Sequence, residues 1–200
     1  HQGVSVANKG AFTLWRGSLS NFQADSSSYS SSDYRYGGGA YVKGTFVMNG
    51  GSITGCTATG GNGGGVYVSG GTFTMNAGTI TGNRVKTNST NNNGNGGGVY
   101  GSSGTITING GTITGNKATN GGGVYTSYCL LTVDGATITG NTATEAGGGL
   151  YLEPFASAKI IYMGSVYGGG GTIAPYMYDN TVNSAQNNLY LSDPDTQIVF

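Results

Sequence analysis

Charge is the scarcest property of this sequence. Its 200 residues include 8 Lys and Arg, 8 Asp and Glu and one His, so charged residues make up 8%, against about 25% in typical soluble domains. The formal net charge is zero, and the basic residues form no stripe along the chain. Nucleic acid and anionic membrane surfaces attract clustered Lys and Arg, so we expect neither as a partner.

Long apolar runs are absent as well. No run approaches the roughly 18 residues that a membrane-spanning helix needs, so we expect no membrane span. The chain starts at His1 rather than Met, as a processed or trimmed chain does and as a cloned fragment would. We therefore expect a secreted, extracellular or cell-surface protein.

Cysteine is too rare for the common metal and redox motifs. Cys56 and Cys129 lie in different repeats and have no C-x-x-C spacing, which argues against a zinc or thioredoxin-like site. The repeats described below place them about three coils apart, beyond the roughly 7 Å between Cα atoms that a disulfide spans. The sequence therefore predicts two free thiols.

Glycine, in contrast, is abundant and marks an internal repeat. Many of the 41 Gly residues belong to a G-G-G-[AVL]-Y unit. Copies of this unit begin at Gly37, Gly63, Gly96, Gly121 and Gly147, and a degenerate copy spans residues 187–191. The longest step contains a polar insertion at residues 84–95, which predicts a surface loop. A repeat of this length indicates a solenoid.

Within each repeat, apolar and polar residues alternate in short runs, as they do in half-buried strands. Three such runs per repeat, separated by Gly and Asn, predict a three-sided coil of strands. No segment has a helical period. The side chains expected to point inward are Ala40, Val66, Val99, Val124, Leu150 and Leu189 in the first strand; Phe46, Met48, Phe73, Met75, Ile106, Ile108, Leu131 and Val133 in the second; and Ile53, Ile80, Ile113, Ile138 and Val166 in the third.

One such coil cannot bury its apolar face alone, so coils must stack. The sequence predicts an all-β fold, a right-handed parallel β-helix (a three-sided β-solenoid) of about six coils, in a single domain over residues 1–200. We expect an irregular first coil and partial cap at 1–36, regular repeats at 37–152 and degenerate last coils at 153–200. A late copy of the repeat is expected at 159–168.

The repeats resemble the polymorphic outer-membrane protein repeats of bacterial surface proteins, whose motifs are G-G-A-[ILV] and F-x-x-N. Gly38-Gly39-Ala40 falls short of the first motif, because Tyr41 follows in place of Ile, Leu or Val, and residues 46–49 and 73–76 match the second. Residues 106–109 and 131–134 are relaxed copies, and the resemblance covers roughly residues 37–152. It implies a right-handed β-helix that works in adhesion at a cell surface.

Polysaccharide lyases and hydrolases also use parallel β-helices, and their chemistry needs clustered carboxylates with a basic residue. Here no two acidic residues occupy the same strand position on neighbouring coils, and the single His is residue 1. Asp193 and Asp195 are the closest pair, a candidate for calcium or catalysis, but Asp-Pro-Asp is typical of a turn. We expect no enzyme, no catalytic residue, no metal and no cofactor.

Several outward columns remain as candidate surfaces. The tyrosine column, the main interface candidate, either stabilises the stack or binds a second copy or sugar rings. Its members are Tyr41, Tyr67, Tyr100, Tyr125, Tyr151 and Tyr190. Two corner columns are interpreted as asparagine ladders; they are Asn49, Asn76, Asn109 and Asp134, and Cys56, Asn83, Asn116 and Asn141.

Two further surface features bear on function. Ser52 and Thr54, and the T-x-T pairs that follow at residues 79–81, 112–114 and 137–139, form a hydroxyl grid that resembles the face of ice-binding solenoids. The high β-propensity of Thr accounts for the same pattern. Asn88-Ser89-Thr90 is a candidate glycosylation sequon at Asn88.

Both chain ends read as strands, and open sheet edges invite further strands. The candidate edge residues are Val4, Val6, Ile198 and Phe200. We therefore expect a non-enzymatic structural or adhesive protein that associates head to tail with itself, as an extracellular filament. The alternatives are a fragment of a longer surface adhesin that binds glycans or a host surface, an ice-binding solenoid, and a polysaccharide lyase or hydrolase.

Overall fold

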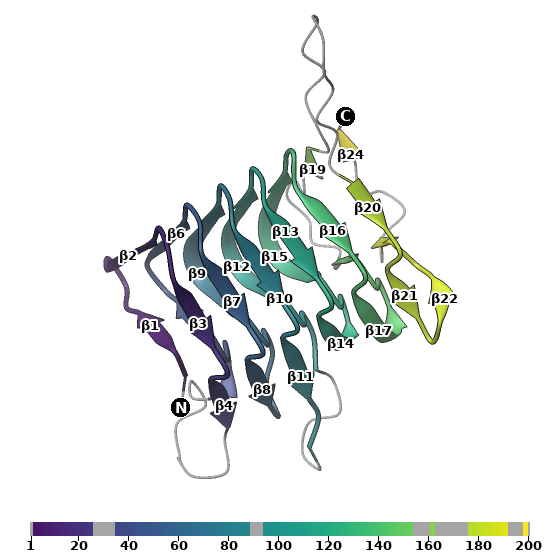
Figure 1. Ribbon diagram of the computed structural model, residues 1–200, viewed down its shortest axis with the longest axis horizontal. Helices are drawn as coiled ribbons and strands as arrows, with labels where there is room; N and C mark the ends of the chain where they lie inside the picture. Colours follow the sequence, from purple (N-terminus) through teal and green to yellow (C-terminus); the bar gives the residue numbers. More distant parts are fainter. Residues whose placement is uncertain are drawn as a thin grey trace, which may run out of the picture.

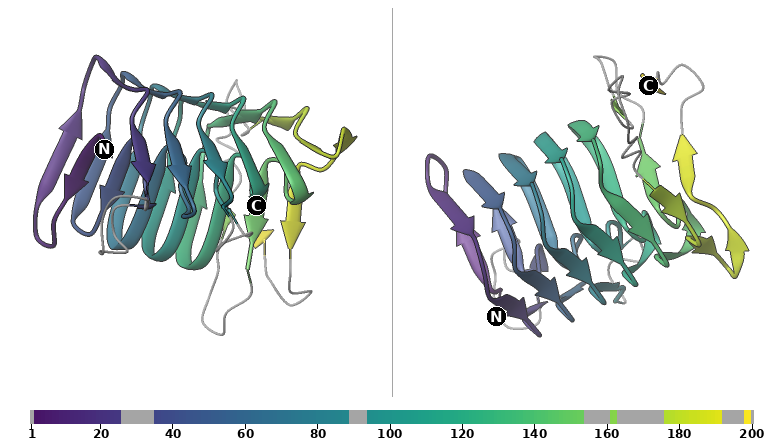
Figure 2. Two further views of the ribbon diagram at one scale, coloured as in Figure 1. Left: turned by 90° about the horizontal axis from the view of Figure 1, so that it is seen from below. Right: turned by 45° about the horizontal axis from the view of Figure 1, so that its top comes forward.

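The chain folds into stacked coils of short strands. A computed structural model describes residues 2–25, 35–88, 94–153, 161–162, 176–191 and 198–199. These residues form strands connected by turns and bends and contain no α-helix. Figure 1 shows the coils following one another in sequence order along the long axis of the molecule, and Figure 2 shows the same order from two other sides.

Sheet A, the largest sheet, contains the G-G-G-[AVL]-Y strands. All of its strand pairs are parallel and join neighbouring coils. Its main path is β1 (Val4–Val6), β5 (Ala40–Val42), β9 (Val66–Met75), β12 (Val99–Ile108), β15 (Val124–Val133), β18 (Leu150–Leu152) and β23 (Leu189–Leu191), with β2 (Ala11–Leu14) and β6 (Thr45–Met48) paired beside it.

Sheet B contains the T-I-T strands and is also parallel throughout. Its order is β3 (Ser18–Ser20), β7 (Ser52–Thr54), β10 (Thr79–Thr81), β13 (Thr112–Thr114), β16 (Thr137–Thr139) and β20 (Tyr176–Tyr178). The middle residue of each strand points into the core, and the two outer residues of each Ser or Thr strand point away from it.

Sheet C follows the asparagine corner of each coil. Its order is β4 (Gln23–Asp25), β8 (Thr57–Thr59), β11 (Arg84–Lys86), β14 (Lys117–Asn120), β17 (Thr142–Ala146), β21 (Thr181–Val182) and β22 (Ala185–Gln186). Only the last pair, β21 with β22, is antiparallel among the described pairs. A separate parallel pair joins β19 (Ile161–Tyr162) to β24 (Ile198–Val199).

The structure confirms an all-β fold with three parallel sheets, but it corrects the predicted division of each coil. The first and second predicted strands belong to the same sheet, and in β9, β12 and β15 they are one continuous strand of 10 residues. The third side of the coil is sheet C, whose strands were not predicted from the sequence. In β11 this side begins at Arg84, so the predicted loop at residues 84–95 is wrong for its first residues.

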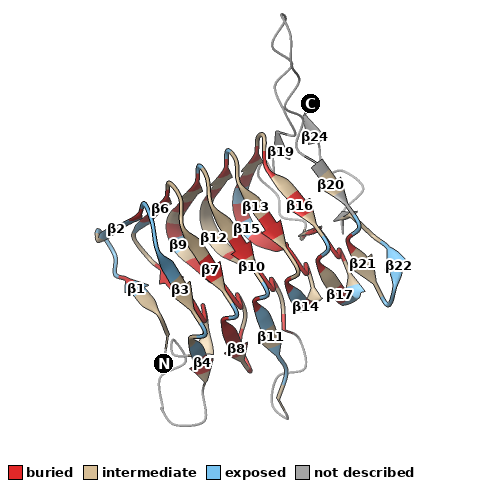
Figure 3. Ribbon diagram, in the orientation of Figure 1, coloured by how far each residue is buried: buried red, intermediate tan, exposed pale blue. Residues whose placement is uncertain are grey.

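The core lies between the three sheets and consists of columns of like residues. The inward positions predicted for residues 40–150 are buried, with Phe46, Phe73 and Ile80 fully enclosed. Figure 3 shows buried residues recurring at similar places on successive strands. The predicted partner of Ile138 is wrong: Met177 in β20 takes the place expected for Val166, which lies outside the described residues.

The described part of the first coil, residues 4–25, does not show the irregularity expected from the sequence. Residues 4–25 pair with the second coil through all three sheets, for example Val4 with Ala40, Leu19 with Ile53 and Ala24 with Ala58. The apolar positions of this coil are therefore in register with the core.

A glycine with a left-handed backbone turns the chain from sheet B into sheet C. Gly82, Gly115 and Gly140 have φ angles of 63°, 64° and 62°, a conformation that costs glycine little. Asp179 occupies the same place before β21 with a φ angle of 53°, and Asp tolerates this region better than most residues. The turn directs the following asparagine into the core.

Candidate functional site

The tyrosine column is a stack of rings rather than an exposed row. Tyr41 and Tyr125 are each 5% exposed. Successive rings from Tyr41 to Tyr151 are stacked with centroids 4.7–5.5 Å apart, and Tyr36 stacks on Tyr67 at 4.5 Å. The rings cover one another, so most of the column offers little free ring face to a sugar. The side chain of Tyr190 lies outside the described residues.

Near the C-terminal end of the column, the Glu153 carboxylate accepts hydrogen bonds from the hydroxyl groups of Ser127 and Tyr125. Burial raises the pKa of Tyr125 well above its ordinary value, and the negative charge of Glu153 raises it further. Burial also raises the pKa of Tyr100, and electrostatic interactions with Tyr67 and Glu153 raise this pKa further. Both phenols are therefore held in the neutral state, which suits a structural hydrogen bond better than proton transfer at neutral pH.

The described part of the chain contains no group of three or more His, Cys, Asp and Glu side chains placed to hold a metal ion. Asp193 and Asp195, the closest acidic pair in the sequence, lie outside the described residues. Cys56 and Cys129 are both buried, and neither forms a disulfide. Burial raises the pKa of the Cys56 thiol, so this thiol is a poor nucleophile.

The predicted asparagine columns are ladders within the stack. Asn83, Asn116 and Asn141 are fully buried. The side-chain oxygen of each accepts a hydrogen bond from the backbone N–H of the residue at the same position in the preceding coil. Asn180 extends this ladder by one coil. The second ladder, Asn49 to Asn109, lies nearer the surface, with side-chain hydrogen bonds of 2.7 and 2.8 Å.

The outer face of sheet B is a regular hydroxyl grid. Ser52, Thr79, Thr112 and Thr137 pair in register, and so do Thr54, Thr81, Thr114 and Thr139. Ser18 and Ser20 add a row at the N-terminal end, and Tyr176 and Tyr178 close the grid at the other end. The two columns are separated by a buried apolar residue, so the grid presents two parallel rows of hydroxyl groups.

The N-terminal end of the stack leaves part of the core uncovered. Val4, Phe12, Leu19 and Phe22 pack against the core but are only partly buried. The residues at the same positions in the next coil, Ala40, Phe46, Ile53 and Cys56, are all 0% exposed. Strands β1, β3 and β4 are the edges of sheets A, B and C. At the other end, Ile198 pairs with Ile161, while Phe200 lies outside the described residues.

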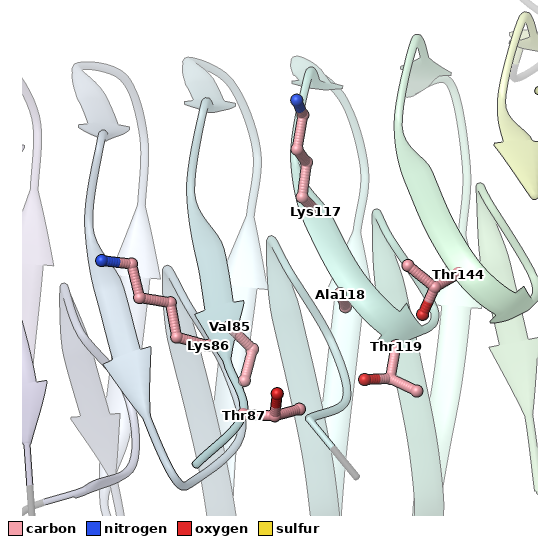
Figure 4. A pocket seen from close by; sticks show the side chains of 7 residues that line it. All are labelled: Val85, Lys86, Thr87, Lys117, Ala118, Thr119 and Thr144. Atoms are coloured by element: carbon pink, nitrogen blue, oxygen red, sulfur yellow. The ribbon is translucent and has the colours of Figure 1, made fainter. Parts of the chain in front are cut away.

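Sheet C carries a group of cations that the sequence analysis did not find. Arg84, Lys86 and Lys117 lie on neighbouring strands, and Arg84 pairs directly with Lys117. Lys86 and Lys117 line a hollow of about 420 Å³ (Figure 4). This group was not predicted because residues 84–95 were interpreted as a loop. Residues 84 and 117 lie side by side only through the register of β11 and β14.

The candidate glycosylation residue, Asn88, directly follows Thr87, which lines the hollow. Asn88 is half-buried, and its side chain packs over Gly60. The two residues that complete its sequon lie outside the described residues.

Among the described residues, no helix has the length and apolar character required to cross a membrane. No family model, curated protein or solved structure matches the chain.

Proposed function

We propose that the chain is a non-enzymatic structural or adhesive protein, secreted or held at a cell surface, that associates end to end with copies of itself. In this proposal the fold is a right-handed β-helix of about six coils, the hand that parallel crossover connections almost always take. The resemblance to polymorphic outer-membrane protein repeats supports an adhesive role. The low charge of the chain supports self-association, because it removes repulsion between copies.

The uncovered N-terminal end of the core carries this proposal. Val4 and Phe12 come from sheet A, Leu19 from sheet B and Phe22 from the corner before β4. An added coil would bury them as the first coil buries the equivalent residues of the second coil. Among the described strands, the outer edges of β1 and β3 also present backbone N–H and C=O groups to a neighbouring strand. Burial of apolar area and strand pairing would thus act together at one contact.

The far end of the stack indicates which sheets take part. Strands β20 and β23 are parallel edges of sheets B and A, whereas the antiparallel β22 forms the edge of sheet C. We therefore expect sheets A and B to continue into the next copy and sheet C to be interrupted. Such a contact joins two different surfaces, so it produces open filaments unless the rotation between copies closes a ring.

Electron microscopy across a concentration series, with light scattering, tests the proposal. The N–H of Val4 and the C=O of Val6 bond to the second coil, so the N–H and C=O of Ser5 face the free edge. Ser5→Pro therefore removes an edge donor without disturbing β1, and Ser5→Thr keeps it as the matched control. The proposal is supported if the parent and S5T form long filaments and S5P forms shorter ones. Short rods of the parent at every concentration would contradict it and favour a segment of a longer adhesin.

The hydroxyl grid on sheet B supports ice binding as a second candidate function. Its threonines repeat at the strand spacing of roughly 4.8 Å, with a second column two residues away. Thermal hysteresis of the freezing point is the test, with Thr112→Lys in the grid and Thr107→Lys on sheet A as the control. Hysteresis in the parent and T107K but not in T112K supports this function, and its absence from the parent excludes it.

A further inference from the structure

The cations of this chain are unevenly distributed. Three of the eight Lys and Arg residues, Arg84, Lys86 and Lys117, lie on two adjacent strands of sheet C. Arg84 and Lys117 are direct cross-strand partners, and the backbones of such partners lie about 4.8 Å apart in the hydrogen-bonding direction. All three side chains are exposed, and Arg84 donates from Nε to the Thr57 hydroxyl at 3.2 Å.

Like charges that face each other across a ladder destabilise a sheet. Neither the Lys86 nor the Lys117 ammonium group has a hydrogen-bond or ion-pair partner among the described residues. The acidic residues on the described strands of sheet C are not direct neighbours of these lysines. Asp25 lies two strands from Lys86. Glu145 lies one coil beyond Lys117 and accepts a hydrogen bond from the Asn120 side-chain amide. A concentration of positive charge that the fold leaves unneutralised in a chain this poor in charge indicates an anionic ligand.

The hollow beside these cations has a clear structural cause. Strands β11 and β14 pair only at Arg84 and Lys117, because beyond that point Thr119 bonds instead to Gly94, which approaches from the inserted segment. Thr119 accepts from the Gly94 N–H through its hydroxyl, at 3.3 Å. The two strands separate, and a hollow of about 420 Å³ opens between them.

The lining of the hollow combines three kinds of group. Lys86 and Lys117 supply positive charge, Val85 and Ala118 supply an apolar floor, and threonines supply hydroxyl groups. Figure 4 shows Thr87 and Thr119 at one end of the lining, with the ammonium groups of Lys86 and Lys117 pointing away from Thr87 and Thr119. Charged groups next to hydroxyl groups and a small apolar patch are complementary to a sugar ring that carries an acid.

We infer that this face of sheet C binds an acidic polysaccharide whose sugars carry carboxylate groups. The carboxylates would lie against Arg84, Lys86 and Lys117, where the Arg84 guanidinium offers paired N–H donors that match a carboxylate. Sugar hydroxyls would bond to the threonines. A duplex nucleic acid fits less well, because its dense phosphates favour proteins with many more cationic contacts.

This inference deepens the adhesive role proposed above by naming a ligand class, and it does not depend on end-to-end association. The two proposals can fail independently. Filament formation depends on the ends of the stack and is measured by microscopy, whereas polysaccharide binding depends on the side of the stack and is measured by calorimetry.

The experiment is isothermal titration calorimetry of the full chain with polygalacturonate, in a series of salt concentrations. The test variant is Lys86→Gln/Lys117→Gln. The control is Lys9→Asn/Arg16→Gln, which removes the same charge from exposed positions on the first coil. Melting curves by circular dichroism check folding, and removal of the like charges is expected to leave the melting point unchanged or slightly higher.

We expect the parent to bind polygalacturonate but not a neutral galactan, with affinity that falls as salt rises. The sheet C variant should bind at least about tenfold more weakly, which corresponds to about 1.4 kcal/mol, and the control should stay within twofold of the parent. Absence of binding by the parent, equal losses in both variants, or tighter binding of a DNA duplex at the same salt concentration would each overturn the inference.

Discussion

The side-chain nitrogen of Asn116 donates to the side-chain oxygen of Asn141, one coil further along, at 2.9 Å. The same nitrogen also donates to the Ile80 carbonyl at 3.0 Å, in the coil before. Each buried asparagine thus links three coils. Because its oxygen accepts from both the backbone and the side chain of the preceding coil, the ladder leaves few polar groups of the corner without partners.

Replacement of Asn116 by Ala should destabilise the fold strongly. The change leaves the buried Asn83 N–H without its acceptor and removes one donor from the Ile80 carbonyl, which the pairing of β10 with β13 still satisfies. An unsatisfied buried group costs about 1–3 kcal/mol and a lost hydrogen bond about 1 kcal/mol, so we expect a loss of roughly 2–4 kcal/mol in the free energy of unfolding. Urea unfolding followed by circular dichroism measures it. Asn109→Ala in the exposed ladder is the control and should cost under about 1 kcal/mol; equal losses would contradict a special role for the buried ladder.

Cys56 occupies the first place of the buried ladder, where its thiol lies 3.5 Å from the Leu19 carbonyl. An asparagine there would donate to Leu19 as Asn83 donates to Ile53. Because a net hydrogen bond contributes about 1 kcal/mol, Cys56→Asn should stabilise the fold by about that amount. The control, Cys129→Asn, places an amide in the apolar core beside Ile106 and should destabilise it. Destabilisation by both changes would show that the ladder does not extend to the second coil.

The sequence predicted the apolar columns well because alternation is a local property. Phe46, Phe73 and Ile106 each lie two residues before another apolar residue, which is the period of a strand, and the copies align without ambiguity. Sheet C was missed for the opposite reason. Its strands are short and carry small inward residues such as Ala58 and Ala143, so their apolar contrast is weak. In addition, β11 runs directly into the polar insertion.

Properties that depend on neighbouring coils were harder to predict. Alternation places Tyr41 and Tyr125 outside the core, but their burial comes from rings contributed by residues about 25–26 positions away. The cation group of Arg84 and Lys117 has the same origin. Met177 was missed because 39 residues separate Asn180 from Asn141, a longer step than between the preceding coils.

Thr126 is expected to be a weak point of the core. Its direct partners in the register are Gly101 and Leu152, and the column continues through Val68, Val42 and Val6. Its buried hydroxyl has no hydrogen-bond partner among the described residues. Valine has nearly the same shape without the hydroxyl, so Thr126→Val should stabilise the fold by about 1–2 kcal/mol. The midpoint of urea unfolding measures the effect. Thr107→Val, on the outer face of the same sheet, should change it by less than about 0.5 kcal/mol.

Alkaline pH should destabilise the stack through its tyrosines. The pKa of Tyr100 and the pKa of Tyr125 are both raised in the folded state, mainly by burial. Below pH of about 10, the ordinary tyrosine pKa, folded and unfolded chains bind these protons equally. Above it the unfolded chain releases them while the folded chain keeps them, so the free energy of unfolding falls as pH rises.

The measurement is urea unfolding between pH 8 and pH 11.5, with phenolate absorbance as a second readout. The double variant Tyr100→Phe/Tyr125→Phe keeps the stacked rings and removes both titrating hydroxyl groups, so its stability should decline less steeply above pH 10. Glu153→Gln separates the two causes, because it removes the negative charge that opposes phenolate at Tyr125 while leaving the burial intact. Its decline should lie between those of the parent and the double variant. An identical decline in all three proteins would place the alkaline sensitivity elsewhere in the chain.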